Sequence, residues 1–138
     1  MRITRRKTFN AGHRLFRQEW DDIKNREVFG SCSNPNWHGH NYTLFVTVEG
    51  RVDPETGFVM NLKALSKLVD EFVISKLDHK NINLEVDFMK GVIASTENLA
   101  IGIFRQLENP IRDQGARLYC IKLWETENHY VEYFGGKQ

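Results

Sequence analysis

The amino-acid sequence predicts an α+β domain, in which two helices cover one face of a four-stranded antiparallel sheet. Three observations lead to this fold class. Residues 38–49 show the period-two pattern and the β-branched and aromatic content of a strand, two segments with helical periodicity follow, and two short apolar segments come last. The predicted order is strand, strand, helix, helix, strand, strand (ββααββ).

The composition indicates one globular domain over residues 1–138, because domains cluster near ~100–150 residues. Hydrophobic residues make up 41% and charged residues 27%, which suits a packed core and excludes a disordered chain. No apolar run is long enough for a membrane span, and none follows the basic N-terminal segment as in a secretory signal. We therefore expect no membrane partner and a cytoplasmic location. The two cysteines exclude a disulfide framework.

The net charge of +1 is unevenly distributed. Residues 1–26 hold eight Lys or Arg and three Asp or Glu, and the remaining residues are acidic overall. The balanced total argues against a nucleic-acid-binding protein. The basic first segment is either a solvated face or a region that meets an anionic small molecule.

The first half of the chain contains two predicted strands. The first, Ile3 to Ala11, is weak, and about thirty polar residues predicted to be irregular follow it; stretches of this kind are often functional. The second strand begins at His38, and residues of one parity share a face: His38, His40, Tyr42, Leu44, Val46 and Val48. Residues 53–57, Asp-Pro-Glu-Thr-Gly, predict a turn.

Two helices are predicted in the second half. Apolar residues recur at helical spacing over 61–76, with Asn61 as the N-cap. The second helix opens at Ser95, has an acidic residue in its first turn and ends near Asn109-Pro110.

A hairpin is predicted from Leu118 to Glu125 and from His129 to Phe134, joined at Thr126-Glu127-Asn128. Both strands carry apolar residues of both parities, so we expect both faces of the sheet to be buried. A second buried face in so small a chain suggests self-association.

Three histidines form the most informative group. His38 and His40 are two residues apart on a strand and point to one side, and pairing of the first two strands brings His13 near them. Three imidazoles with a fourth position open are the ligand set of a catalytic zinc. The alternative is a pair of hydrogen-bonded histidines near a turn, without a metal.

Cys32 lies among small polar residues six positions before His38. It could be a fourth metal ligand, or a nucleophile or base whose thiolate is favoured by a nearby cation. A buried inert thiol is the alternative, and that interpretation fits Cys120 in its apolar strand.

Carboxylates supply the remaining candidates. Asp78-His79 could move protons, or could be a chance pair at a helix end. Glu125 could accept two hydrogen bonds from an amidine-like edge, or be an ordinary turn residue. Glu97 could simply complement a helix N-terminus, and His129 is predicted to face solvent.

Six segments in order resemble the 6-pyruvoyl-tetrahydropterin synthase family, from about Phe9 to Phe134. They are residues 9–13 (FNAGH), 32–42 (CSNPNWHGHNY), 57–62 (GFVMNL), 77–81 (LDHKN), 95–100 (STENLA) and 125–128 (ETEN). The resemblance implies the tunnelling (T-) fold, in which the sheets of three protomers join into a barrel and two trimers stack into a homohexamer. It also implies active sites between protomers, with Cys32 and the zinc from one chain and Asp78-His79 from another.

The resemblance also implies roles for individual residues. His13, His38 and His40 would bind zinc, Cys32 would be the proton-abstracting base, and Asp78 and His79 would complete a proton relay. Glu125 would anchor the pterin, helped by Ser95, Thr96 and Glu97. The implied activity is that of a carbon–oxygen lyase of tetrahydrobiopterin biosynthesis, which converts 7,8-dihydroneopterin triphosphate to 6-pyruvoyl-tetrahydropterin and triphosphate.

Three other functions remain open. The same family includes 6-carboxytetrahydropterin synthases of queuosine biosynthesis, which use the same substrate and release acetaldehyde. Five residues, Ser33 to Trp37, separate Cys32 from the HGH motif, as in the pyruvoyl enzymes, whereas the carboxy enzymes have a shorter spacing. The others are a non-catalytic T-fold module that binds a purine or pterin, and a zinc hydrolase acting on a different substrate.

Overall fold

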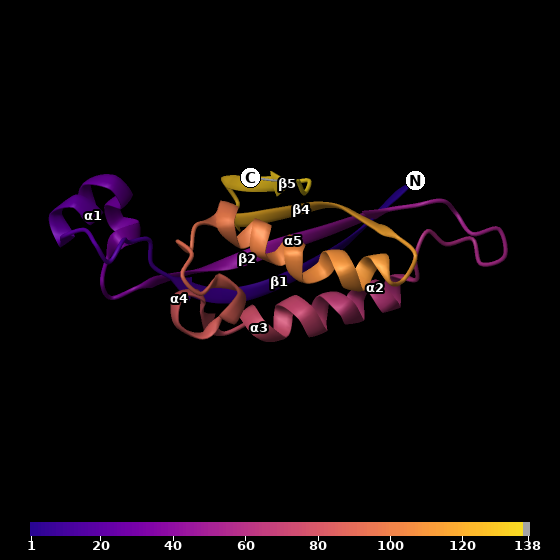
Figure 1. Cartoon of the computed structure of the whole chain (residues 1–138), viewed down its shortest axis with the longest axis horizontal. Coiled ribbons are helices and arrows are strands. Elements are labelled where there is room, and N and C mark those ends of the chain that lie inside the picture. Colours follow the sequence, from indigo (N-terminus) through magenta and orange to yellow (C-terminus); the bar gives the residue numbers. More distant parts are fainter. Residues whose placement is uncertain (137–138) are drawn as a thin grey trace.

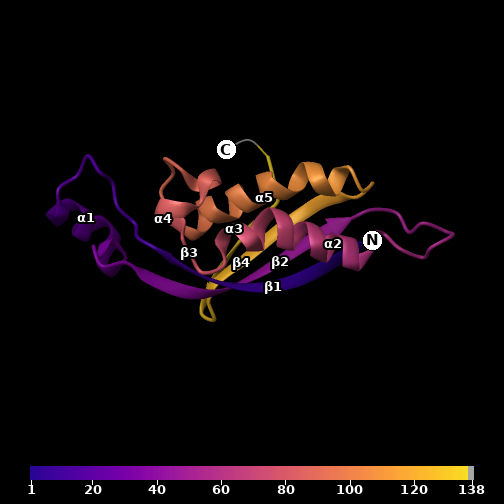
Figure 2. The ribbon, with the colours of Figure 1, turned by 90° about the horizontal axis from the view of Figure 1, so that it is seen from below.

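A computed structural model describes residues 1–136 and has an α+β architecture of two layers, with one sheet covered by helices (Figures 1 and 2). The strands are β1 (Arg2–His13), β2 (His38–Glu49), β3 (Lys80–Asn81), β4 (Arg117–Thr126) and β5 (His129–Tyr133). The helices are α1 (Asp22–Phe29), α2 (Leu62–Val69), α3 (Ser75–Leu77), α4 (Ile82–Glu85) and α5 (Thr96–Arg112). The sheet order is β3-β1-β2-β4-β5.

The long β1–β2 pair forms the centre of the sheet. It is antiparallel and in continuous register, from Arg2 opposite Glu49 to His13 opposite His38. Phe9 stacks on Tyr42 with ring centroids 4.9 Å apart, on the face toward the helices. A slip of one residue would turn these buried side chains to the other face, so burial fixes the register.

The prediction of a four-stranded antiparallel sheet was incomplete. β3 adds a fifth strand, which pairs in parallel with β1 at Ala11 and Gly12. Its two residues, Lys80 and Asn81, are too few to show an alternating pattern. The other four strands run antiparallel in the predicted order, and β4 and β5 form the predicted hairpin.

The first predicted helix, 61–76, is confirmed as one continuous helical segment. α2 leads into a π-helical turn over Asp70–Ile74 and then into α3. Asn61 is the N-cap, and its side-chain oxygen accepts hydrogen bonds from the amides of Lys63 and Ala64 at 2.8 and 3.3 Å. These bonds satisfy donors that lack an intrahelical partner.

The second predicted helix, α5, begins at the predicted cap. The Ser95 hydroxyl accepts a hydrogen bond from the amide of Asn98 at 3.3 Å. The helix continues past Pro110 to Arg112, slightly beyond the predicted end. Within residues 1–136, no helix combines the length and apolar character needed to cross a membrane.

The segment between β1 and β2 is more ordered than predicted. It contains α1 and a 3-10 turn over Gly30–Ser33. The buried Asn25 amide donates to the carbonyl oxygens of Arg17, Trp20 and Asp21 at 3.0–3.1 Å. Polar hydrogen bonds hold this segment together. The helix α1 therefore does not need an apolar stripe, and the sequence pattern did not predict it.

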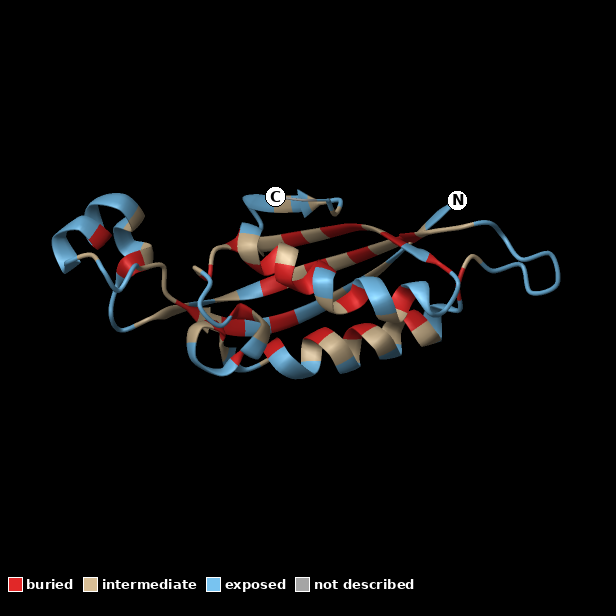
Figure 3. Cartoon of the chain, in the orientation of Figure 1, coloured by how far each residue is buried: buried red, intermediate tan, exposed pale blue. Residues whose placement is uncertain are grey.

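One face of the sheet carries the helices, and none of the elements within residues 1–136 covers the other face (Figure 2). The buried residues lie mainly between the sheet and α2 and α5 (Figure 3). The open face carries Phe45, Trp124 and Tyr130, whose neighbouring rings are 5.8 Å apart. Within a single chain, the prediction that both faces are buried is therefore not met.

Candidate metal centre and functional site

Three histidines meet at the end of the β1–β2 pair. The register places His13 opposite His38, and His40 follows two residues later on the same face. One ligand atom from each residue lies within 4.8 Å of the others, and His13 is only 1% exposed. The structure thus brings together the three histidines that the sequence singled out, and they could hold a metal ion.

The hydrogen bonding of these rings favours a metal. Nδ1 of His13 donates to the carbonyl oxygen of Ala94 at 2.7 Å, which leaves the Nε2 lone pair free. Among the described residues, Nε2 of His13, Nε2 of His40 and both ring nitrogens of His38 are buried without a hydrogen-bond partner. Buried polar atoms without partners are uncommon and costly, and a bound cation would satisfy them. Imidazole ligands suit zinc, copper, iron or nickel better than magnesium or calcium.

Burial sets the protonation state of the three rings. Removal from water lowers the pKa of His13, His38 and His40, and it outweighs the opposing effect of the Glu125 charge on each. The rings are therefore neutral at pH 7, the form in which imidazole binds metals.

Glu125 lies at the end of β4, beside the histidines. Its Oε1 is 3.7 Å from Nε2 of His40 and its Oε2 is 4.0 Å from Nε2 of His13. The Thr96 hydroxyl donates to Oε2, and Nε2 of His129 is 3.1 Å from Oε1. Burial opposes ionisation of Glu125, but these hydrogen bonds and the nearby histidines outweigh it and lower the pKa of the carboxyl.

Sequence reasoning missed two features of this carboxylate. It did not place Glu125 next to the histidines, because that contact depends on how β4 pairs with β2. It also assigned His129 only to solvent. The His129 side chain is 59% exposed, yet its ring contacts Glu125 across the hairpin. The signal available was the tight hairpin itself, in which Thr126 pairs with His129.

The start of α5 supplies one of its three predicted site residues to this cluster. Thr96 is buried and donates to Glu125. Ser95 is used as the helix cap, and Glu97 is exposed in the first turn. The carboxylate is thus positioned by the helix that begins above it.

Cys32 is half-buried in the 3-10 turn that precedes β2. Its carbonyl oxygen accepts a hydrogen bond from the Leu15 amide at 2.8 Å, and the Ser33 carbonyl accepts one from Nε of Arg14 at 2.7 Å. The turn is therefore fastened to the residues that directly follow His13.

Tyr42 underlies the histidine cluster and was not among the predicted site residues. Its hydroxyl is 3.5 Å from Nδ1 of His13, and the side chain is fully buried. Burial, together with the negative charge of Glu125, raises the pKa of this hydroxyl far above its usual value. Tyr42 therefore stays protonated and neutral.

Asp78 and His79 contact each other, as the sequence suggested, but lie on a different surface. Oδ1 of Asp78 accepts from the Asn10 amide at 2.9 Å, and Oδ2 is 3.0 Å from Nδ1 of His79. The bond from Asn10, followed by the contact with His79, lowers the pKa of Asp78. His79 has a φ of 59° and lines a cavity of about 350 Å³ with His40 but without Cys32. Cys32 therefore does not border the cavity that His79 lines.

A larger cavity adjoins Glu125. It has a volume of about 670 Å³, and its lining includes Arg6, His40, Trp124 and Glu125. This volume is within the range of about 300–1,000 Å³ found for small-molecule sites. The carboxylate and one histidine of the cluster therefore border a space that could hold a ligand.

Replacing one histidine tests the metal centre. We expect His38→Ala to lose most of its bound transition metal, because it leaves two imidazoles at a site whose metal would be held by three protein ligands. Metal per chain is measured by inductively coupled plasma mass spectrometry after dialysis against a chelator. The control is His79→Ala, an exposed histidine outside the cluster, which should keep its metal. Equal metal in His38→Ala and the unmodified protein would contradict the assignment.

Comparison with known proteins gives one consistent family. The pattern of the family described as 6-pyruvoyl tetrahydropterin synthase matches residues 2–136. A 6-pyruvoyl tetrahydrobiopterin synthase of Pongo abelii is 45% identical over 133 residues, which cover 96% of this chain and 90% of the relative. A 6-carboxy-5,6,7,8-tetrahydropterin synthase of Rickettsia typhi is more distant, with 26% identity over 148 residues that cover 96% of this chain and 99% of the relative.

The fold agrees with the sequence comparison. The solved structure of Caenorhabditis elegans 6-pyruvoyl tetrahydropterin synthase matches with a TM-score of 0.91 at 35% identity, and the match covers 99% of this chain and 96% of that one. Both the extent of the family match and the identity to these relatives therefore lead to one conclusion. The chain belongs to the 6-pyruvoyl tetrahydropterin synthase family.

Proposed function

We propose that this protein is a zinc-dependent 6-pyruvoyl-tetrahydropterin synthase. It converts 7,8-dihydroneopterin triphosphate to 6-pyruvoyl-tetrahydropterin and triphosphate. The observation that carries the proposal is the set of unpartnered histidine nitrogens beside Glu125, in a chain of this family. The reaction is an internal redox transfer with elimination, so electrons stay within the substrate and its leaving group, and no external oxidant is needed.

His13, His38 and His40 hold the zinc in this proposal. Zinc bound there would polarise the side-chain hydroxyls of the substrate and so acidify the adjacent C–H bonds. The protein's part is to present three neutral imidazoles. The carbonyl of Ala94 orients His13 through its Nδ1 hydrogen, and burial keeps the rings unprotonated.

Proton transfer is assigned to two groups. Cys32, fixed next to the residues that follow His13, takes a carbon-bound proton as a thiolate. The imidazole of His79, held by Asp78 at 3.0 Å, returns a proton to the substrate. Asp78 orients the ring, and the lowered pKa of its own carboxyl keeps it ionised at neutral pH.

Glu125 anchors the pterin. Its ionised carboxylate can accept two parallel hydrogen bonds from the amino-pyrimidinone edge, in the way that a carboxylate binds a guanidinium. Thr96 and His129 hold it in place, and the neighbouring cavity of about 670 Å³ has room for the ring. Ser95 positions Thr96 by capping α5. Glu97, in the first turn of α5, is assigned to the same pterin subsite.

We also infer that the active protein is an assembly, a trimeric barrel stacked in pairs into a hexamer. Two observations support self-association. The aromatic face of the sheet is not covered by any described part of the chain, and Tyr130 and Phe134 are 49% and 52% exposed. The cavity that His79 lines does not include Cys32, which favours a site to which a neighbouring chain supplies one of the two residues.

The product of the reaction tests the main proposal. We expect zinc-loaded protein to convert 7,8-dihydroneopterin triphosphate to 6-pyruvoyl-tetrahydropterin, identified by mass spectrometry. Cys32→Ala should keep its zinc and lose turnover by about 100-fold or more, because removal of a general base typically costs about 10²–10⁴. Near-normal turnover of Cys32→Ala would remove Cys32 as the base.

Other products decide between the alternatives. A 6-carboxy pterin with acetaldehyde would keep the site but identify a 6-carboxytetrahydropterin synthase, the activity named for the more distant Rickettsia relative. Absence of triphosphate release from protein that contains zinc would leave a binding module or a hydrolase of another substrate.

The anchor role of Glu125 has its own test. We expect Glu125→Gln to weaken pterin binding about tenfold or more, because an ionised acceptor is replaced by a neutral one that also carries donors. Affinity for a pterin analogue is measured by calorimetry, with zinc content measured in parallel. Glu127→Gln, an exposed carboxylate in the adjacent turn, is the control. Loss of zinc with unchanged pterin affinity would instead make Glu125 a metal-facing group.

Mixing of variants tests the shared site. Cys32→Ala and His79→Ala should each be inactive alone. Chains of both variants, unfolded together and refolded, should regain part of the activity, because some sites then combine an intact Cys32 with an intact His79 from another chain. The size of the mixed assembly is followed by light scattering. No recovery from refolded mixed oligomers would show that both residues act within one chain.

A further inference from the structure

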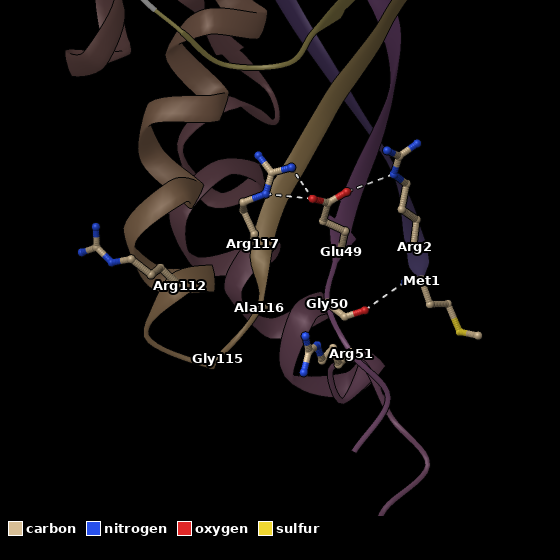
Figure 4. A pocket seen from close by; sticks show the side chains of 9 residues that line it. All are labelled: Met1, Arg2, Glu49, Gly50, Arg51, Arg112, Gly115, Ala116 and Arg117. Carbon is tan, nitrogen blue, oxygen red and sulfur yellow. Dashed lines mark hydrogen bonds and ion pairs between the residues drawn. The ribbon is translucent and has the colours of Figure 1, made fainter. Parts of the chain in front are cut away.

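Four arginines gather at the end of the sheet opposite the histidines. This arginine cluster consists of Arg2 at the start of β1, Arg51 after β2, Arg112 at the end of α5 and Arg117 at the start of β4 (Figure 4). The four residues and Glu49 line an open cavity of about 860 Å³. No role proposed above uses this cavity.

A single carboxylate organises two of the arginines. Glu49 accepts a hydrogen bond from Nε of Arg2 at 3.1 Å and one from Nε of Arg117 at 2.9 Å, with a further contact from Nη2 of Arg117 (Figure 4). The Arg2 guanidinium also lies over the Tyr119 ring, 3.4 Å from its centroid. Both guanidiniums are thus held in place before any ligand arrives, which lowers the entropy cost of binding.

Positive charge exceeds negative charge in this cavity. Glu49 is the one carboxylate among the lining residues, against four guanidiniums. Arg51 forms no ion pair within residues 1–136, and the contact of Arg112 with its neighbour Asp113 is 3.9 Å long and exposed. Exposed pairs of this kind are weak. The cluster therefore keeps an excess of about three positive charges, or two if Asp113 is included.

The cluster is distinct from the histidine centre of the same chain. Arg2 and His13 stand at opposite ends of β1, eleven residues apart. At ~3.3 Å per residue, this separation is roughly 35 Å. A ligand at the arginines could not touch the metal ligands of its own chain.

We propose that the arginine cluster binds a small polyphosphate anion, either inorganic polyphosphate or the triphosphate of a nucleotide. The guanidinium fork matches phosphate oxygens, and several excess charges match a multivalent anion better than a single carboxylate. The charges form one compact group at a sheet end, whereas nucleic-acid binding needs a basic stripe or face along the backbone.

Hydrogen–deuterium exchange with mass spectrometry locates the site. Saturating inorganic tripolyphosphate should slow exchange in peptides that cover residues 49–52 and 112–117. Peptides that cover 13–16 and 38–41 report separately on the histidine centre. ATP is the second probe. Equal protection by ATP and tripolyphosphate would show that only the phosphate chain is recognised. Tighter binding of ATP would show that the protein also contacts the nucleoside. Either result supports the proposal.

Charge variants test the mechanism by calorimetry. We expect Arg51→Gln with Arg112→Gln to weaken tripolyphosphate binding about tenfold, because two charge-assisted contacts are lost. The control pair, Arg26→Gln with Lys67→Gln, removes the same total charge from exposed sites outside the cluster and should bind as the unmodified protein. Glu49→Gln keeps an oxygen that can accept a hydrogen bond from an arginine but removes the repelling negative charge, so it should bind about threefold more tightly.

Several results would overturn the proposal. Equal weakening by the control pair would show a nonspecific effect of net charge. Protection only around residues 13–16 and 38–41 would place the anion at the histidine centre. Orthophosphate binding as tightly as tripolyphosphate would refute recognition of a polyphosphate, and binding of duplex RNA in preference to tripolyphosphate would indicate a nucleic-acid surface instead.

Discussion

The uninterrupted antiparallel pairing of β1 with β2 is the constraint on which the rest of the structure depends. Twelve residue pairs run from Arg2 and Glu49 to His13 and His38 without a bulge. Because the side-chain period of a strand is two, this register determines both which side chains enter the core and which histidines lie close enough to bind one metal ion. The same stacking of Phe9 on Tyr42 that fills the core also sets His13 beside His40, so packing and metal-site geometry cannot vary independently.

The electrostatics of the site follow from burial of a few polar groups. Three imidazoles are kept neutral by desolvation, and one carboxylate, Glu125, is kept ionised by hydrogen bonds despite desolvation. Each group is thus held in the protonation state that its proposed role requires, a neutral ligand or an anionic acceptor. The Thr96 hydroxyl at the start of α5 helps to keep Glu125 ionised. The Ala94 carbonyl just before this helix orients the His13 ring, and burial lowers the pKa of His13 despite that hydrogen bond.

The sequence alone predicted the features that have a strong local signal. The parity of His38 and His40, the Asn61 cap and the terminal hairpin each depend on spacing within a short segment, and all three are present. Three features were not predicted because they depend on distant contacts. β3 exists only as a partner for Ala11 and Gly12, α1 is held by the buried Asn25 amide, and Glu125 reaches the histidines only through the pairing of β4 with β2.

The layering of the fold is also related to the positions of the candidate functional residues. One face of the sheet is covered by α2 and α5, and the other carries an aromatic cluster suited to contact with another chain. The residues assigned to sites lie at the strand ends and edges: histidines and Glu125 at one end, arginines and Glu49 at the other, and Asp78 with His79 at the β3 edge. A sheet of this kind can therefore carry two unrelated sites on one hairpin, because the buried strand centres separate them.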